Sequence, residues 1–202
     1  ANGLEPNLFS YSAAISACEK ALQWERALRI LVEMHHRHAK PNLISYNAAI
    51  SACEKCGQWQ RALMHVAEMQ ERDLKPDEIS YNAAISAYEK GGQWQLALRM
   101  LAEMLQQEGL LPDVVSFNAA ISACSKGVQW DLAFELLFEM RGQRLDPDVI
   151  TYNALINGCA KGEQWERAGK ILSEMFEEQQ KPNIITYNAV ISACEKCQQW
   201  EP

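Results

Sequence analysis

The sequence predicts an all-α fold, a superhelix of antiparallel helical hairpins, from three repeating features. Tryptophans that each follow a Gln recur every 35 or 36 residues, at Trp24, Trp59, Trp94, Trp130, Trp165 and Trp200. Prolines keep the same step, at Pro6, Pro41, Pro76, Pro112, Pro147 and Pro182. Variants of the tract SYNAAISAC lie between them. A period of this length is typical of a solenoid, in which each unit buries its apolar side against its neighbours.

The unit from Leu43 to Asp77 illustrates the expected hairpin. Its first helix has apolar residues at i, i+3, i+4 and i+7, with Ser45 as the expected N-cap; they are Tyr46, Ala49, Ile50 and Cys53. Residues 55–57 interrupt the pattern, and a second helix follows with the apolar residues Trp59, Ala62, Leu63, Val66 and Met69. Pro76 cannot continue that helix, so the unit ends there.

The same pattern divides the whole chain into repeats. No tract alternates with the period of two that a strand requires, and Gly109 lies in the turn that absorbs a one-residue insertion in the third unit. The predicted boundaries are 1–7 for the end of a preceding repeat, 8–42, 43–77, 78–113, 114–148 and 149–183 for five complete repeats, and 184–202 for a truncated sixth.

Composition restricts the possible partners. The formal net charge is −7 and the isoelectric point is near 5.2, which disfavours binding of nucleic acid through overall charge alone. A polyanion must therefore meet a local basic surface. The chain has no apolar run of membrane-spanning length and no recognisable targeting leader, so we predict no membrane partner.

The chemistry-bearing side chains predict neither a metal site nor an enzyme. Five of the seven cysteines share one repeat position that suits a small core residue, Cys18, Cys53, Cys124, Cys159 and Cys194. The pairs Cys53-x-x-Cys56 and Cys194-x-x-Cys197 lie four repeats apart, too far to share one zinc ion. The three histidines at 35, 36 and 38 have no partners in other units. Without a phosphate loop, a nucleophile–base pair or a carboxylate cluster, we predict no catalysis and no cofactor.

The repeated residues resemble one family of helical repeats. The phrase PDVITYNALI from Pro147 to Ile156, followed by Ala168 and Glu174-Met175, is similar to the pentatricopeptide repeat. Tetratricopeptide repeats fit less well, because their Trp lies in the first helix and here it opens the second. The resemblance implies a right-handed α-solenoid superhelix that binds single-stranded RNA in sequence-selective fashion, about one base per repeat.

The resemblance also implies which residues select each base. One follows the aromatic residue of the first helix, and the other follows the Pro that closes the unit. These base-selecting pairs are Ser12 with Asn42, Asn47 with Asp77, Asn82 with Asp113, Asn118 with Asp148, and Asn153 with Asn183, while Asn188 of the truncated repeat lacks a partner. An Asn amide offers donors and an acceptor, and an adjacent Asp can orient it. By the family's pattern the target is 5′-AUUUC-3′.

Two further rows of residues complete the predicted interface. The family sandwiches bases between apolar side chains two residues before the aromatic, here Phe9, Ile44, Ile79, Val115, Ile150 and Ile185. Lysines recur eight residues after the first base-selecting position of each repeat, and we expect them to contact the RNA backbone. They are Lys20, Lys55, Lys90, Lys126, Lys161 and Lys196. With five or six phosphate contacts, a plot of log affinity against log salt concentration would have a slope of about −3.5 to −4. Alternatively, these lysines cap the C-terminal ends of the first helices.

Other interpretations remain open from the sequence. The rival function is a helical scaffold that holds a protein or peptide, which an acidic solenoid can also provide. The first helix of the truncated repeat, near residues 189–191, predicts self-association as an effect of truncation. The family resemblance suggests a mitochondrion or plastid and roles in RNA processing or stability, whereas no residue of the chain itself indicates a location.

Overall fold

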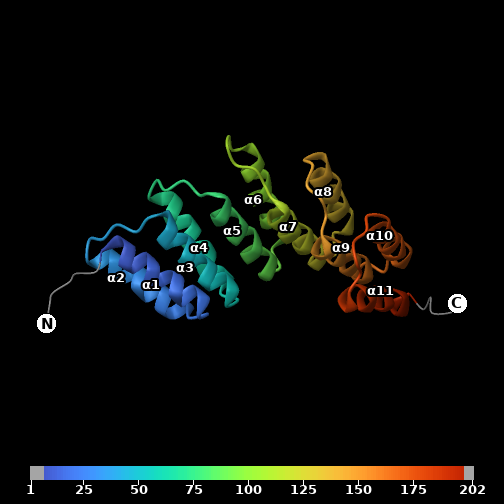
Figure 1. Cartoon of the computed structure of the whole chain (residues 1–202), viewed down its shortest axis with the longest axis horizontal. Coiled ribbons are helices and arrows are strands. Elements are labelled where there is room, and N and C mark those ends of the chain that lie inside the picture. Colours follow the sequence, from blue (N-terminus) through green and yellow to red (C-terminus); the bar gives the residue numbers. More distant parts are fainter. Residues whose placement is uncertain (1–6, 198–202) are drawn as a thin grey trace. The chain divides into compact units, whose positions relative to one another are not determined.

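The computed structural model describes residues 7–197, and within them every regular element is an α-helix of 13 residues (Figure 1). The helices are α1 (Leu8–Lys20), α2 (Trp24–His36), α3 (Leu43–Lys55), α4 (Trp59–Glu71), α5 (Glu78–Lys90), α6 (Trp94–Gln106), α7 (Val114–Lys126), α8 (Trp130–Gly142), α9 (Val149–Lys161), α10 (Trp165–Glu177) and α11 (Ile184–Lys196). The all-α fold is confirmed. Residues 1–6, in the predicted end of a preceding repeat, and Trp200, in the predicted truncated sixth repeat, lie outside the described residues.

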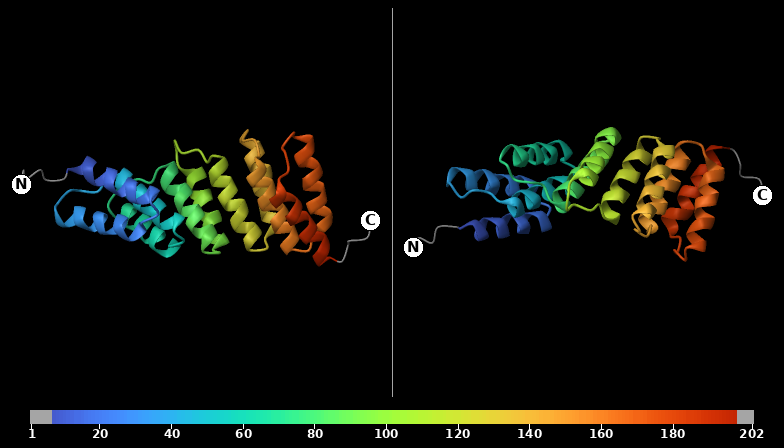
Figure 2. Two further views of the ribbon diagram at one scale, coloured as in Figure 1. Left: turned by 60° about the horizontal axis from the view of Figure 1, so that its bottom comes forward. Right: turned by 90° about the horizontal axis from the view of Figure 1, so that it is seen from above.

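The described helices form two compact units, α1–α5 up to residue 91 and α6–α11 from residue 92 onward. In each unit the odd-numbered helices are the first helices of hairpins and contact one another in order, α1 with α3 and α3 with α5, or α7 with α9 and α9 with α11. Each even-numbered helix contacts the odd-numbered helices on either side of it within its unit (Figure 2). This is the nearest-neighbour packing of a repeat solenoid.

Each first helix begins at a capping Asn or Asp that directly precedes it. In α3, the side chain of Asn42 accepts a hydrogen bond from the backbone N–H of Ser45, at 3.0 Å. The expectation that Ser45 is the N-cap was therefore wrong by three residues: Ser45 is the third helical residue. The same cap opens every first helix, with Asn7, Asn42, Asp77, Asp113, Asp148 and Asn183 as N-caps.

The turn inside each hairpin needs one residue in the left-handed region. Gly57 and Gly92 supply it with φ of 72° and 68°, but Leu22, Val128 and Glu163 adopt it in the other hairpins. The next backbone N–H then bonds back across the helix end, for example from Gln58 to the carbonyl of Cys53 at 2.8 Å. Glycine is thus favoured but not required at this turn.

The predicted apolar stripe of the first helix forms the core. Tyr46, Ala49, Ile50 and Cys53 are fully buried. Burial raises the pKa of the Cys53, Cys124 and Cys159 thiols to about 11. These thiols are therefore protonated at neutral pH and behave as small apolar side chains.

Candidate nucleic-acid interface

Two of the predicted base-selecting pairs, one in each unit, are joined by a hydrogen bond between their side chains. The Asn47 side chain on α3 donates from Nδ2 to Oδ1 of Asp77 at 2.9 Å. Asn118 on α7 donates in the same way to Asp148 at 3.0 Å. Because Asp77 and Asp148 are also the N-caps of α5 and α9, the rigid start of one helix fixes the acceptor that orients the amide of the preceding repeat.

The amides of these pairs are almost enclosed. Asn47 is 7% exposed and Asn118 is 8% exposed. Their acid partners are more accessible, in the intermediate range between buried and exposed. An amide held this tightly presents one fixed hydrogen-bonding edge, which is the property a selective base contact needs.

The remaining pairs differ in detail. Ser12 reaches Asn42 through a bridge, because its hydroxyl lies 2.9 Å from that of Ser45, which donates to Asn42 Oδ1 at 2.9 Å. Asn153 and Asn183 both contact the hydroxyl of Thr186, at 2.6 and 3.1 Å.

The other base-selecting positions remain predictions. Asn82 lies on α5 in the first unit and Asp113 caps α7 in the second, so the pairing of these two residues stays a prediction. Asn188 is exposed on α11.

The predicted sandwiching residues form a regular exposed row. Each is the second residue of a first helix, two residues after the Asn or Asp that caps that helix. Their exposed fractions are 81% for Phe9, 60% for Ile44, 60% for Ile79, 57% for Val115, 62% for Ile150 and 60% for Ile185. Apolar side chains exposed at one position of every repeat mark an interaction surface better than scattered ones do.

The predicted lysine row is uneven in charge. Each lysine is the last residue of a first helix. In the first unit, Lys55 pairs with Glu19 and Lys90 with Glu54, both at 2.7 Å. Lys90 also donates to the backbone carbonyl of Glu54 at 3.0 Å, at the end of the neighbouring helix α3. These two lysines therefore join adjacent repeats, and Lys90 also caps the end of the preceding first helix. Whether the lysines contact RNA remains a prediction.

In two repeats the acid that directly precedes the lysine is replaced. This residue is Ser125 in the fourth repeat and Ala160 in the fifth, whereas it is a Glu in the other four, at positions 19, 54, 89 and 195. Among residues 7–197, Lys20, Lys161 and Lys196 are exposed lysines of the row that form no ion pair. These unpaired lysines belong to the first, fifth and sixth repeats.

Comparison with known families identifies the fold. The model of the PPR repeat family matches residues 41–86, 76–126, 112–161 and 147–196, and that of the pentatricopeptide repeat domain matches residues 1–55. Together these matches cover most of the chain. The protein belongs to the pentatricopeptide repeat family. No sequence among the curated proteins matches it.

Solved pentatricopeptide repeat structures resemble this one over most of its length. The structure of PPR10 with an 18-nt psaJ RNA element is 26% identical with a TM-score of 0.69, and the match covers 98% of this chain and 27% of that chain. PPR10 itself is from maize. The PPR domain of Arabidopsis thaliana protein-only RNase P 1 in complex with tRNA has 16% identity and a TM-score of 0.76, with coverage of 90% and 95%. At that lower identity the likeness concerns the fold.

The tryptophans of these pentatricopeptide repeats lie at joints between repeats. Each described Trp opens a second helix and is half-buried. A Cβ atom added to Gly91 would come within 2.7 Å of Trp59, and one added to Gly162 within 2.6 Å of Trp130. Arg167 of the following repeat lies over the Trp130 ring at 4.0 Å from its centroid. The Trp side chain therefore packs against the turn of the next repeat, where glycine allows the close approach.

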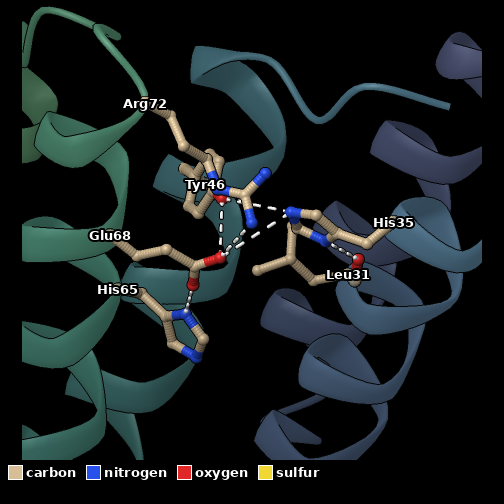
Figure 3. Close-up of polar contacts among 6 residues, drawn as sticks. All are labelled: Leu31, His35, Tyr46, His65, Glu68 and Arg72. Carbon is tan, nitrogen blue, oxygen red and sulfur yellow. Dashed lines mark hydrogen bonds and ion pairs between the residues drawn. The ribbon is translucent and has the colours of Figure 1, made fainter. Parts of the chain in front are cut away.

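A polar cluster links the first two repeats through His35 on α2, whose Nε2 lies 3.7 Å from Oε1 of Glu68 on α4 (Figure 3). Tyr46 donates to Glu68 at 3.1 Å, His65 Nδ1 lies 3.0 Å from the same carboxylate, and Arg72 donates to it at 3.0 Å. Burial alone would raise the pKa of Glu68, but the hydrogen bonds from His65 and Tyr46 outweigh burial and lower it. Burial and the adjacent carboxylate raise the pKa of Tyr46 to about 12.

A related cluster joins the fourth and fifth repeats. Arg141 on α8 donates to the Tyr152 hydroxyl at 3.0 Å and to Glu178 at 2.6 Å, and it also pairs with Glu174. Desolvation opposes the charge of Arg141, but the carboxylates outweigh it and raise its pKa. In both clusters a Tyr of the first helix donates to a Glu near the end of the second helix of the same repeat. The preceding repeat is linked to this pair by His35 in the first cluster and by Arg141 in the second.

Neither cluster resembles a metal centre. Within residues 7–197, no three His, Cys, Asp or Glu side chains are grouped so that they could hold a metal ion. His35, one of the clustered histidines, donates from Nδ1 to the Leu31 carbonyl at 2.8 Å. No described helix is long and apolar enough to cross a membrane.

Proposed function

We propose that this chain binds single-stranded RNA without catalysis, using about one repeat per base and preferring 5′-AUUUC-3′. The observation that carries the proposal is the bonded pair of Asn47 with Asp77, which recurs as Asn118 with Asp148. Each pair lies beside an exposed apolar residue at the start of a first helix. Membership of the pentatricopeptide repeat family supports the same function, since a PPR10 structure and a protein-only RNase P 1 structure each contain RNA.

The geometry suits single-stranded RNA better than a duplex. Base edges and base faces are both accessible only when the strand is unpaired. The fixed amides would contact an edge, and side chains such as Ile44 and Ile79 would cover a face. Aliphatic side chains would contribute less per base than the roughly 1–3 kcal/mol of aromatic stacking. Selectivity would then depend mainly on the amides and their partners.

The first test is competition between RNAs. We expect an RNA that contains AUUUC to displace a labelled copy at least about tenfold more effectively than a scrambled RNA of equal composition, as a few selective contacts of about 1 kcal/mol each would produce. A gel-shift series measures this. If both RNAs compete equally, the chain does not select bases by these pairs. If neither binds, the rival function as a protein- or peptide-binding scaffold becomes the better one.

The second test concerns salt. Lys55 and Lys90 already have carboxylate partners, so we expect phosphate contacts mainly from Lys20, Lys161 and Lys196. Each phosphate contact on a single strand contributes roughly −0.7 to the slope of log affinity against log salt concentration. Three contacts should therefore give a slope of about −2. This is shallower than the value expected from six free lysines. Titrations at four salt concentrations measure it, and a slope steeper than about −3 would show that the ion pairs open on binding.

The wider biological role follows from family resemblance alone. Placement in a mitochondrion or plastid, and a role in RNA processing or stability, remain predictions. The chain spans 27% of PPR10, so the activities of that longer protein are not transferred to it. The predicted self-association through α11 also remains a prediction, motivated by the exposed side chains of Ile184 and Ile191 on that helix.

A further inference from the structure

A row of buried hydroxyls lies directly behind the base-selecting amides. These third-position hydroxyls belong to the third residue of each first helix after α1, namely Ser45, Ser80, Ser116, Thr151 and Thr186. All five residues are 0% exposed. None of them was singled out from the sequence as a functional residue.

Three of these hydroxyls donate to the amide oxygen of the preceding repeat. The distances to Oδ1 are 2.7 Å from Ser80 to Asn47, 2.5 Å from Thr151 to Asn118, and 2.6 Å from Thr186 to Asn153. Each hydroxyl also lies near Oδ1 of its own N-cap, but at the longer distances of 2.8, 3.0 and 3.1 Å. A hydroxyl has one proton to donate, and the shorter contact is the one to the amide.

This contact determines which way the amide faces. When Oδ1 accepts from the hydroxyl, Nδ2 of the same amide points away from that hydroxyl. In the second and fourth repeats the carboxylates of Asp77 and Asp148 accept from Nδ2, so the amide orientation is fixed twice. An inverted amide there would place its oxygen beside a carboxylate oxygen, which is repulsive.

The fifth repeat lacks the second constraint. Its closing residue is Asn183, whose Oδ1 is occupied by the backbone N–H of Thr186 at 3.0 Å. Among the described residues, the hydroxyl of Thr186 is the hydrogen-bond partner of the Asn153 side chain, and Asn183 is not bonded to it. The orientation of this amide therefore depends on one hydroxyl.

We infer that the third-position hydroxyls are positioning residues for base selection, and that Thr186 by itself sets which edge of Asn153 faces the fifth base. The inference rests on the proposed function. Held by Thr186, Asn153 offers its Nδ2 donor to a pyrimidine acceptor. Without the hydroxyl, the amide can present either its donor or its acceptor, and discrimination at that base falls.

The test compares two matched substitutions, Thr186→Val and Thr151→Val. Both remove a hydroxyl that accepts from the N-cap backbone N–H, at 3.0 and 3.1 Å, so both carry a similar cost in helix capping. Affinities are measured for RNAs that vary only the fifth base or only the fourth. Thr186→Val should lower the ratio of pyrimidine to purine affinity at the fifth base about fivefold, the value of one neutral hydrogen bond.

Thr151→Val should lower the preference at the fourth base less, by under about twofold, since Asp148 still holds Asn118. Thr186→Ser keeps the hydroxyl and should restore most of the fifth-base ratio. Ser173→Ala removes an exposed hydroxyl on α10 that bonds only its own helix, and it should leave every ratio unchanged. Thermal melting accompanies each variant, and Thr186→Ala replaces Thr186→Val if the latter fails to fold.

A purely structural role for Thr186 would weaken binding to all RNAs equally and leave the fifth-base ratio at its original value. That result would overturn the inference while leaving the proposed function intact. Equal losses in Thr186→Val and Thr151→Val would also overturn it, because the carboxylate would then have no separate effect. An unsubstituted chain that shows no preference at the fifth base would contradict the proposed function itself.

Discussion

Replacing Asp148 with Asn is expected to move the preference at the fourth base from U toward C by about tenfold, with little loss of stability. Asp148 Oδ1 accepts from the backbone N–H of Thr151 at 2.9 Å, as the N-cap of α9, and from Asn118 Nδ2 at 3.0 Å. Asn is as good an N-cap as Asp, and Asn42 and Asn183 already serve as N-caps in this chain. The substitution therefore changes the amide's partner while keeping the helix start. The direction toward C follows from the family pattern.

Two controls separate capping from selection. Asp148→Ala removes both functions, so it should lower the free energy of unfolding by about 1 kcal/mol and weaken discrimination at the fourth base. Asp146→Asn removes the same charge from an exposed residue two positions earlier and should leave the preference unchanged. The measurements are melting curves and affinities for RNAs with U or C at the fourth base. If Asp148→Asn still prefers U as strongly, Asp148 does not select that base.

The repeat itself was highly informative about fold. A period of 35 or 36 residues and one apolar stripe per helix were enough to predict the hairpins, because each repeat is stabilised only by its neighbours. The boundary error at Ser45 has a simple cause. Ser and Asn are both good N-caps, and the sequence contains Asn42 and Ser45 three residues apart. The choice depends on which backbone N–H groups remain unpaired, and that is visible only in the structure.

Some features of the interface depend on contacts between repeats, and these could not be predicted from one repeat at a time. The partner of Lys55 is Glu19, 36 residues earlier. Glu19 and Glu54 directly precede lysines in the sequence, but their pairing with the lysine of the next repeat requires the stacking geometry. The third-position hydroxyls were missed for the same reason. Their signal was present, since a Ser or Thr stands at that position in every repeat, but the sequence allowed the simpler interpretation of a cap.

The glycines show how two physical reasons can look alike in sequence. Gly57 and Gly92 have positive φ and allow the turn. Gly127 and Gly162 lie one residue earlier in their turns, where the backbone is ordinary, and they leave room for Trp94 and Trp130 of the preceding repeat. In those two turns Val128 and Glu163 adopt the left-handed conformation instead. Close approach of the Trp ring therefore explains these two glycines, and turn geometry does not.

The largest expected effect on stability comes from removing the Trp130 ring, which packs against the turn of the next repeat at Gly162. Trp130→Ala should lower the free energy of unfolding by about 3 kcal/mol, the lower end for loss of a large aromatic side chain, because the ring is half-buried. It removes the packing of α8 against Gly162 and the contact with Arg167. Chemical denaturation measures the total, and hydrogen exchange should show that amides of α10 and α11 lose protection more than those of α7, since coupling in a solenoid runs between neighbours.

Arg167→Ala provides the matched control for this joint. It removes the charge over the Trp130 ring, a more distant contact with the Phe134 ring and an exposed bond to Asp131 at 3.3 Å, so it should cost about 0.5–1 kcal/mol. A loss below about 1 kcal/mol for Trp130→Ala would mean that the ring is not the joint between these repeats. Equal losses for both variants would assign the coupling to the arginine contact. The proposed base selection requires adjacent repeats to keep the spacing of Asn118 and Asp148. On that proposal, Trp130→Ala should also weaken binding at the fourth and fifth bases more than at the first.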